Sequence, residues 1–408
     1  MKIISASWII SSNKDKQILQ NHSVVYDKKI IEIAPTDEIL KKFPNITVET
    51  LKPNSVITAG FINPHIHFEF SKNKSTLKYG SFMSWLSSVI ANREELIESL
   101  KDEDITNICE DLLSNGTTTI GAISSYGFDL NALSKAPQTV VFFPEVLGSK
   151  PDMVDTLYAD FLARLQSAID IQNEKFIPAI AIHAPYSTHP ILIKKVLTHA
   201  NALDCPVQAH FMESPEEKKW LQSDKGAFKE FFASFLGQKK ALCKPMEFLE
   251  LFENTTNVSF THCTEVGKAE FEFISKIGAN IIHCPVSNRL LNNNKLNLKN
   301  SANCTKAIAT DGLSSNTSLN ILDELKMALM IHEEKNLNEL SNDLIYYATA
   351  GGAKVLNLQK GQIETDFDAD LVCFELSKEI NDPKDLALDI ILHSSKPTKV
   401  ILGGQSVR

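Results

Sequence analysis

The chain has 408 residues, which is more than one small domain needs and enough for a large barrel with a smaller companion. Its formal charge of -9 at pH 7 argues against nucleic acid as a partner, and no apolar run reaches the ~18 residues that a membrane span needs. The seven cysteines are scattered without a CxxC pair, so we expect buried, reduced thiols in a cytoplasmic protein.

Short strands are expected at both ends of the chain. Apolar pairs and triplets in the first 57 residues alternate with polar turns such as Asn-Lys-Asp, and the same pattern returns after about residue 358. We expect the strands of the two ends to pair. Residues 1–57 and 359–408 would then form one small β-sandwich domain, flanking a central domain of residues 58–358.

The central residues alternate between apolar strand-like runs and amphipathic helical stretches. The expected strands are 57–67, 117–123, 139–147, 177–183, 206–211, 258–263, 280–284 and 306–310. Eight strands with interleaved helices are typical of a (β/α)8 TIM-type barrel, an α/β fold. The strands are apolar throughout rather than alternating, which fits a parallel sheet that is covered on both faces.

Polar residues gather at the carboxyl ends of these strands. His65 and His67 point the same way, because side chains two positions apart on a strand share a face. Further polar residues at predicted strand ends are His183, His210, His262, His283 and Asp311. In barrels this rim is where active sites are built, and converging imidazoles with a carboxylate indicate a metal site.

Six motifs in chain order resemble the amidohydrolase superfamily, and specifically its mononuclear, adenosine-type deaminases. They read GFINPHIH, HAPYST, QAHFMESPEE, THCTE, HCPVSN and ATDGLSSN. The resemblance implies that His65, His67, His210 and Asp311 bind one divalent metal ion, with Zn²⁺ expected before Fe²⁺. Binuclear members carry a bridging lysine at the fourth strand. This chain has none there, so we expect a single ion.

The same resemblance implies the catalytic residues. Glu213, three residues after His210, would shuttle protons to the substrate ring, and a dry pocket would raise its pKa for that task. His262 would polarise the attacking water beside Asp311. His183 would contact the ring, whereas the role of His283 stays open.

The substrate implied is a nucleoside. Trp85 and Glu94 match a stretch in which the glutamate holds ribose hydroxyls, Ser315 is placed to touch the purine, and Arg289 is the candidate for the 5′ substituent. The implied reaction is hydrolytic removal of the 6-amino group from a 5′-modified adenosine, first of all 6-amino-6-deoxyfutalosine of menaquinone biosynthesis. Alternatives are 5′-methylthioadenosine, S-adenosylhomocysteine or adenosine, a free base such as guanine or cytosine, and triazine dechlorination. The sequence leaves open whether the protein forms a homodimer.

Overall fold

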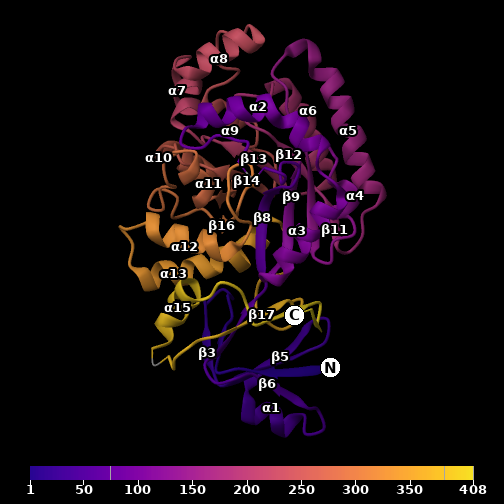
Figure 1. The fold of residues 1–408 in the computed structure, drawn as a ribbon, viewed down its shortest axis with the longest axis vertical. Helices are drawn as coiled ribbons and strands as arrows, with labels where there is room; N and C mark the ends of the chain where they lie inside the picture. The colour runs from indigo at the N-terminus through magenta and orange to yellow at the C-terminus, as the bar shows by residue number, and fades with distance from the viewer. Residues whose placement is uncertain (74, 381, 408) are drawn as a thin grey trace.

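The computed structural model describes residues 1–73, 75–380 and 382–407, and its larger part is a barrel of parallel strands surrounded by helices (Figure 1). Neighbouring strands follow one another in chain order. The barrel strands are β8 (Phe61–His67), β9 (Thr117–Ser124), β10 (Thr139–Val146), β12 (Ile180–Ile182), β13 (Val207–Phe211), β14 (Val258–His262), β15 (Asn280–His283) and β16 (Lys306–Ile308). Nearly all of their side chains are buried, so the prediction of a (β/α)8 barrel is confirmed.

Hydrogen bonds between the first and last strand segments close the barrel. The backbone N–H of Asp311 donates to the carbonyl of His65 at 3.1 Å. Nearer the start of β8, the side-chain amide of Asn63 donates to the Thr310 hydroxyl at 2.8 Å. The closure therefore brings the His65 and His67 end of β8 directly beside Asp311.

Amphipathic helices cover the outside of the barrel. In α3 (Asp102–Ser114) the buried residues include Ile105, Cys109 and Leu112, whose spacing of four and three residues places them on one face. The other barrel helices are α2 (Phe82–Glu98), α4 (Leu130–Leu133), α5 (Val154–Asp170), α6 (Pro190–Leu203), α7 (Pro215–Ser223), α8 (Ala227–Leu236), α9 (Pro245–Glu250), α10 (Lys268–Lys276), α11 (Pro285–Leu290), α12 (Ile321–Ile331), α13 (Leu337–Tyr346) and α14 (Gly352–Val355).

Two small sheets lie below the barrel in Figure 1, and one of them joins the two chain ends. The N-terminal sheet has the order β5 (Ile30–Pro35), β4 (His22–Tyr26), β1 (Lys2–Ser5) and β6 (Val48–Thr50). The mixed sheet has the order β19 (Gln405–Ser406), β18 (Lys399–Leu402), β17 (Leu371–Glu375), β7 (Ser55–Ala59), β2 (Trp8–Ile10) and β3 (Ile18–Gln20). Helix α1 (Thr36–Lys42) packs on β4 and β5 of the N-terminal sheet, whereas α15 (Leu386–His393) packs on the barrel helices α12 and α13. The expected pairing of the two ends is thus present, while the exact domain boundaries stay a prediction.

The expected strand 57–67 is in fact two strands that belong to different sheets. Strand β7 pairs with β17 and β2, whereas β8 begins the barrel, and Gly60 separates them. A Cβ at Gly60 would lie 2.2 Å from the hydroxyl oxygen of Thr118, so only glycine fits this crossing. In the same way the expected strand 177–183 is split into β11 (Phe176–Pro178) and β12, which pair with successive parts of β10.

Two predictions from the composition concern the state of the cysteines and membrane-spanning helices. All seven cysteines are buried and free of disulfides. Within the described ranges, no helix is both long enough and apolar enough to cross a bilayer.

Candidate metal centre and active site

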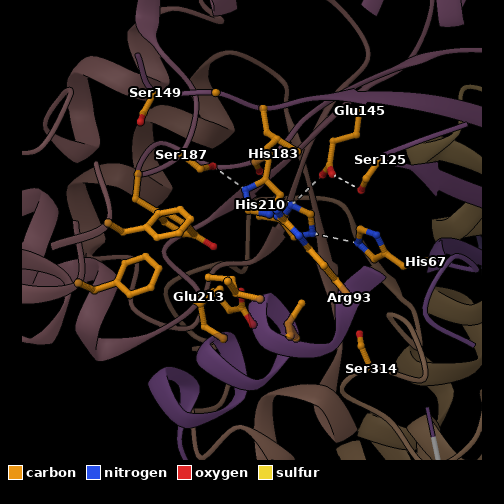
Figure 2. A pocket seen from close by; sticks show the side chains of 18 of the residues that line it. His67, Arg93, Ser125, Glu145, Ser149, His183, Ser187, His210, Glu213 and Ser314 are labelled. Atoms are coloured by element: carbon orange, nitrogen blue, oxygen red, sulfur yellow. Dashed lines mark hydrogen bonds and ion pairs between the residues drawn. The ribbon is translucent and has the colours of Figure 1, made fainter. Parts of the chain in front are cut away.

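Three histidines from two barrel strands converge at the rim of the barrel. The ligand nitrogens of His65, His67 and His210 lie within 4.8 Å of one another, and Nε2 of His67 is 3.3 Å from Nε2 of His210 (Figure 2). A tetrahedral zinc site with bonds of ~2.0–2.1 Å places neighbouring ligand nitrogens roughly 3.3 Å apart. The His67–His210 pair therefore has the spacing of two ligands of one divalent metal ion, and His65 lies close enough to be a third.

Hydrogen bonds leave the inward-facing nitrogens without protons. The Gln208 side chain donates to the carbonyl of Pro64 at 2.8 Å, so its oxygen accepts from Nδ1 of His65 at 2.9 Å. Nδ1 of His210 likewise donates to the carbonyl of His183 at 2.9 Å. In a neutral imidazole the second nitrogen then carries a lone pair. Nε2 of His65 is buried without a partner in the described parts of the chain, which is a further sign that the donor set fits a metal ion.

Burial keeps these imidazoles neutral. It lowers the pKa of His65 and of His210 to about 4, although Asp311 opposes the shift in both cases. Burial also lowers the pKa of His67 well below its usual range. Metal ligation needs the neutral form of histidine, and these three residues have it at neutral pH.

Two hydroxyl donors hold the Asp311 carboxylate beside the cluster, and the backbone at Asp311 is strained. Its Oδ1 lies 3.7 Å from Nε2 of His67 and 3.9 Å from Nε2 of His65. Oδ2 accepts hydrogen bonds of 2.8 Å from Ser287 and Ser315, and φ is +59°. Burial would raise the pKa of Asp311, but the nearby histidines outweigh it and hold this pKa below its usual range.

Glu213 has the opposite electrostatic environment. It is 5% exposed, and its Oε1 lies 3.8 Å from Nε2 of His262. Burial, followed by the charges of Asp311 and Glu217, raises the pKa of Glu213 well above its usual value. The site thus shifts the pKa values of two carboxyl groups in opposite directions, which is the arrangement that acid–base chemistry uses.

The loop that carries Glu213 is fixed by its own neighbours. The Glu217 carboxylate accepts from the backbone N–H groups of Met212, at 3.1 Å, and of Glu213, at 2.7 Å. The Thr264 hydroxyl donates to the carbonyl of Glu213 at 2.7 Å. Met212 needs this support because its φ of +51° is unfavourable for a residue other than glycine.

His262 and His183 flank the cluster. Nδ1 of His262 pairs with Oδ1 of Asn288 at 2.9 Å, which turns Nε2 toward Glu213. Nδ1 of His183 pairs with the Ser187 hydroxyl at 2.6 Å. Burial lowers the pKa of both histidines to about 4, so both are neutral.

Glu145, His183 and His210 form a second group of potential ligands. Oε1 of Glu145 lies 3.6 Å from Nδ1 of His210, but this nitrogen already donates to a carbonyl. The second group therefore lacks a free lone pair on this nitrogen of His210. Glu145 therefore lies beside His210, while the carbonyl of His183 is the hydrogen-bond partner that orients this ring.

A cavity of about 390 Å³ opens onto these residues. His67, His183, His210, His262, Asp311 and Glu213 line its inner end. Leu86, Val89 and Ile90 of α2 and Phe231, Phe232 and Phe235 of α8 form part of its outer walls. The cavity is thus polar at the cluster and mainly apolar toward its mouth.

The residues expected to bind substrate are not all at this cavity. Trp85 lines it and donates to the carbonyl of Ser314 at 2.8 Å, whereas Glu94 lines a neighbouring cavity. Ser315 is fully buried behind Asp311, because the backbone turns at Asp311, and Ser314 lines the cavity instead. Arg289 is exposed on α11 and is not among the lining residues of either cavity.

Sequence reasoning missed Glu145, Gln208 and Asn288, although the first two had a signal. Glu145 is a polar residue at the end of an apolar strand, just like His183. Gln208 precedes His210 by two residues on β13 and therefore shares its face. The role of His283 was left open by the sequence. Its Nε2 lies 3.2 Å from Nε2 of His332, and both residues are buried, so His332 is a packing residue.

Comparison with known proteins agrees with this geometry. Residues 56–407 match the model of the amidohydrolase family. Aminodeoxyfutalosine deaminase of a Nitratiruptor species is 42% identical over 405 residues, covering 99% of both chains. Adenosine deaminase of Helicobacter pylori is 35% identical over 416 residues, covering 100% of this chain and 99% of its own.

A solved structure shows the same fold over the whole length. The crystal structure of Helicobacter pylori aminofutalosine deaminase in complex with methylthio-coformycin superposes with a TM-score of 0.94 at 34% identity, covering 100% of both chains. Sequence family, full-length relatives and fold therefore point the same way. This chain belongs to the amidohydrolase family.

Proposed function

We propose that the protein is a metal-dependent aminohydrolase that converts the 6-amino group of a 5′-modified adenosine to the 6-oxo group and releases ammonia. The observation that carries this proposal is the buried carboxyl group of Glu213, whose pKa is raised, beside the histidine cluster, with Glu213, His67 and His210 lining one cavity. We propose 6-amino-6-deoxyfutalosine as the substrate, because the Nitratiruptor relative named for the deamination of this compound aligns with 99% of the chain at 42% identity.

The metal ion would be held by His65, His67, His210 and Asp311. Three neutral imidazoles and a carboxylate suit Zn²⁺, and also Fe²⁺. When bound, the ion supplies a water molecule that is activated for attack at neutral pH. The hydrogen bonds from Ser287 and Ser315 keep the Asp311 carboxylate directed at the cluster.

Glu213 would perform the proton transfers. In its protonated form it donates to N1 of the purine, which makes C6 electrophilic. The resulting carboxylate takes a proton from the attacking water and passes it to the leaving amino group, so that ammonia departs. The remaining proton of that water returns to the carboxylate as the 6-oxo group forms, which restores protonated Glu213. Nε2 of His262, 3.8 Å from the Glu213 carboxyl group, would orient the water on this path.

The other lining residues would orient the ring and exclude water. His183, fixed by Ser187, would contact the purine, and Trp85 would cover the ring from α2. Burial lowers the local dielectric, which raises the pKa of Glu213 and favours its protonated form before catalysis. Glu94, on the neighbouring cavity, would accept from ribose hydroxyls at the far end of the nucleoside.

The test is Glu213→Gln, with ammonia release and metal content measured on the same preparation. We expect kcat to fall about 10²- to 10⁴-fold while the metal stoichiometry stays at the wild-type value. Glu216→Gln is the matched control, because it makes the same change three residues away and Glu216 does not line the cavity. Near wild-type turnover by the metal-loaded Glu213→Gln variant would refute the assignment.

A second candidate substrate is 5′-methylthioadenosine, because the similar Helicobacter pylori structure was determined with methylthio-coformycin. The value of kcat/KM for 6-amino-6-deoxyfutalosine, methylthioadenosine and adenosine, measured on metal-quantified enzyme, decides between the two. A higher value for methylthioadenosine than for 6-amino-6-deoxyfutalosine would replace the first proposal by the second.

A further inference from the structure

We propose that Glu324 is a positioning residue for Asp311, because it joins the two segments whose serines hold the Asp311 carboxylate. This inference rests on the proposed function, since it takes Asp311 to be a ligand of the metal ion. It concerns a residue of α12 that is not among the lining residues of either cavity.

Glu324 is buried, and both of its carboxylate oxygens accept hydrogen bonds. It lies in the first turn of α12 and is 1% exposed. Oε2 accepts from the backbone N–H of Val286 at 3.0 Å, and Oε1 accepts from the side-chain amide of Asn316 at 2.6 Å. Burying a carboxyl group is costly unless such donors replace its water. The two donors belong to different segments of the chain, which are α11 and the loop between β16 and α12.

The first segment carries one serine and one asparagine of the site. Val286 is followed by Ser287, whose hydroxyl donates to Oδ2 of Asp311 at 2.8 Å. The next residue, Asn288, accepts from Nδ1 of His262 at 2.9 Å. Helix α11 has only six residues and packs on α12. The hydrogen bond from Val286 therefore fixes this short helix at the turn that faces the cluster.

The second segment carries the other serine. Ser315 donates to Oδ2 of Asp311 at 2.8 Å, and Asn316 follows it directly. The side-chain oxygen of Asn316 accepts from the backbone N–H of Thr317 at 2.7 Å. Its NH2 group is thereby directed at the buried carboxylate of α12 and at the carbonyl of Thr310, each 2.6 Å away. The loop beside Ser315 is thus fixed to α12 as well.

The two serines determine which oxygen of Asp311 faces the cluster. Oδ2 accepts both hydroxyl groups, whereas Oδ1 lies 3.7 Å from Nε2 of His67. The backbone of Asp311 is strained, with φ of +59°, so its carboxylate depends on these neighbours to keep its orientation. Because both serine-bearing segments are bound to Glu324, removing its carboxylate should loosen Asp311 without changing any proposed ligand.

The experiment measures the Zn²⁺ affinity of the full-length protein by competition with a chromophoric chelator, without substrate. Glu324→Ala should raise the Kd for Zn²⁺ by about 10- to 100-fold, as is typical when the support of a metal ligand is lost. Glu324→Gln should also bind Zn²⁺ more weakly, because its NH2 group must face one of the two donors. Asp323→Asn is the matched control, since this neighbouring carboxylate forms neither hydrogen bond. Circular dichroism verifies that each variant is folded.

An exchange of the two polar groups distinguishes hydrogen bonding from a simple effect of charge. In the double variant Glu324→Gln with Asn316→Asp, the amide and the carboxylate change places, so the pair can form again while the amide oxygen still accepts from Val286. This double variant should bind Zn²⁺ more tightly than either single variant. Asn316→Asp alone places two carboxylates opposite each other and should weaken Zn²⁺ binding. If the buried negative charge itself attracted the ion, Asn316→Asp would bind Zn²⁺ more tightly than wild type, and this result overturns the inference.

A spectrum and a stability measurement separate positioning from a purely structural role. The visible absorption of the Co²⁺-loaded protein reports the geometry of the ligands, and it should change in Glu324→Ala but not in Asp323→Asn. A lower Tm of Glu324→Ala with unchanged Zn²⁺ affinity and an unchanged Co²⁺ spectrum would make Glu324 a structural residue only and overturns the inference.

The proposed function fails through a different result. Metal-loaded wild-type protein that releases ammonia from no adenosine derivative overturns the proposed function, whereas the Zn²⁺ affinities still decide the role of Glu324. Wild-type protein that binds neither Zn²⁺ nor Co²⁺ overturns the metal centre and this inference together.

Discussion

Replacing Glu217 tests how the catalytic loop is held. Its carboxylate accepts two buried N–H groups, those of Met212 and Glu213, and Glu217→Ala leaves both without this acceptor. Each buried donor without a partner costs about 1–3 kcal/mol, and the left-handed backbone of Met212 adds strain of similar size. The two donors together cost roughly 2–6 kcal/mol, and movement of the loop avoids this cost. We therefore expect the loop to shift while the rest of the protein stays folded.

A shift of this loop moves the Glu213 carboxyl group away from the ring. Because a misplacement of ~1 Å can cost about 10²-fold in rate, we predict that Glu217→Ala lowers kcat by about 100-fold at unchanged metal content. Glu217→Gln keeps one acceptor oxygen, and its effect should be intermediate. Hydrogen exchange of the peptide that contains Met212 and Glu213 should become faster in both variants.

The assay is ammonia release, with metal content measured on the same samples. Glu216→Ala is the control, because it removes a neighbouring carboxylate of the same helix turn that makes neither hydrogen bond. Wild-type kcat together with protected loop amides in Glu217→Ala would show that Glu217 does not position Glu213.

Three further perturbations have defined outcomes. Gly60→Ala should lower the free energy of unfolding in urea by about 1–3 kcal/mol, because the added Cβ meets Thr118. The second substitution Thr118→Ala should recover part of this free energy. An unchanged free energy of unfolding in Gly60→Ala would contradict the crowding at this crossing. Burial raises the pKa of Asp129 from 3.8 to about 7, so between these two values the native state holds a proton that the unfolded state has released. Asp129 should therefore make stability fall as pH rises from about 4 to 7, by up to ~1.4 kcal/mol per pH unit. Asp129→Asn should remove this contribution from the slope of metal-saturated protein, whereas parallel curves would refute it. Chelation should abolish activity and lower Tm, with Zn²⁺ restoring both, since the ion binds only the native state; full activity in metal-free protein would exclude the proposed centre.

The barrel could be predicted because its signals are local and repeated. Apolar strands, amphipathic helices and polar residues at strand ends recur along the chain, and they indicate both the fold and the rim where His210 and Asp311 lie. The break at Gly60 could not be seen in this way. Residues 56–59 and 61–67 are both buried strands, and their separate sheets depend on contacts with β17 and β9, far away in sequence.

The position of individual side chains was harder to predict than the strands. Ser315 and Ser314 are adjacent, and only the left-handed turn at Asp311 decides which one faces the cavity. Arg93 and Glu94 are adjacent as well, but they differ by about 100° around the helix. That rotation places Arg93 on both cavities and Glu94 on the second one alone.

The seam of the barrel has a consequence for the synthesis of the protein. Asn63 and Thr310, which join the first and last strands, are 247 residues apart, and the proposed ligands His65 and Asp311 lie on the two sides of that seam. A growing chain on the ribosome cannot present all four ligands until almost all of the barrel has left the exit tunnel. Metal uptake is then a late event of biogenesis, because the four proposed ligands come together only when the barrel closes.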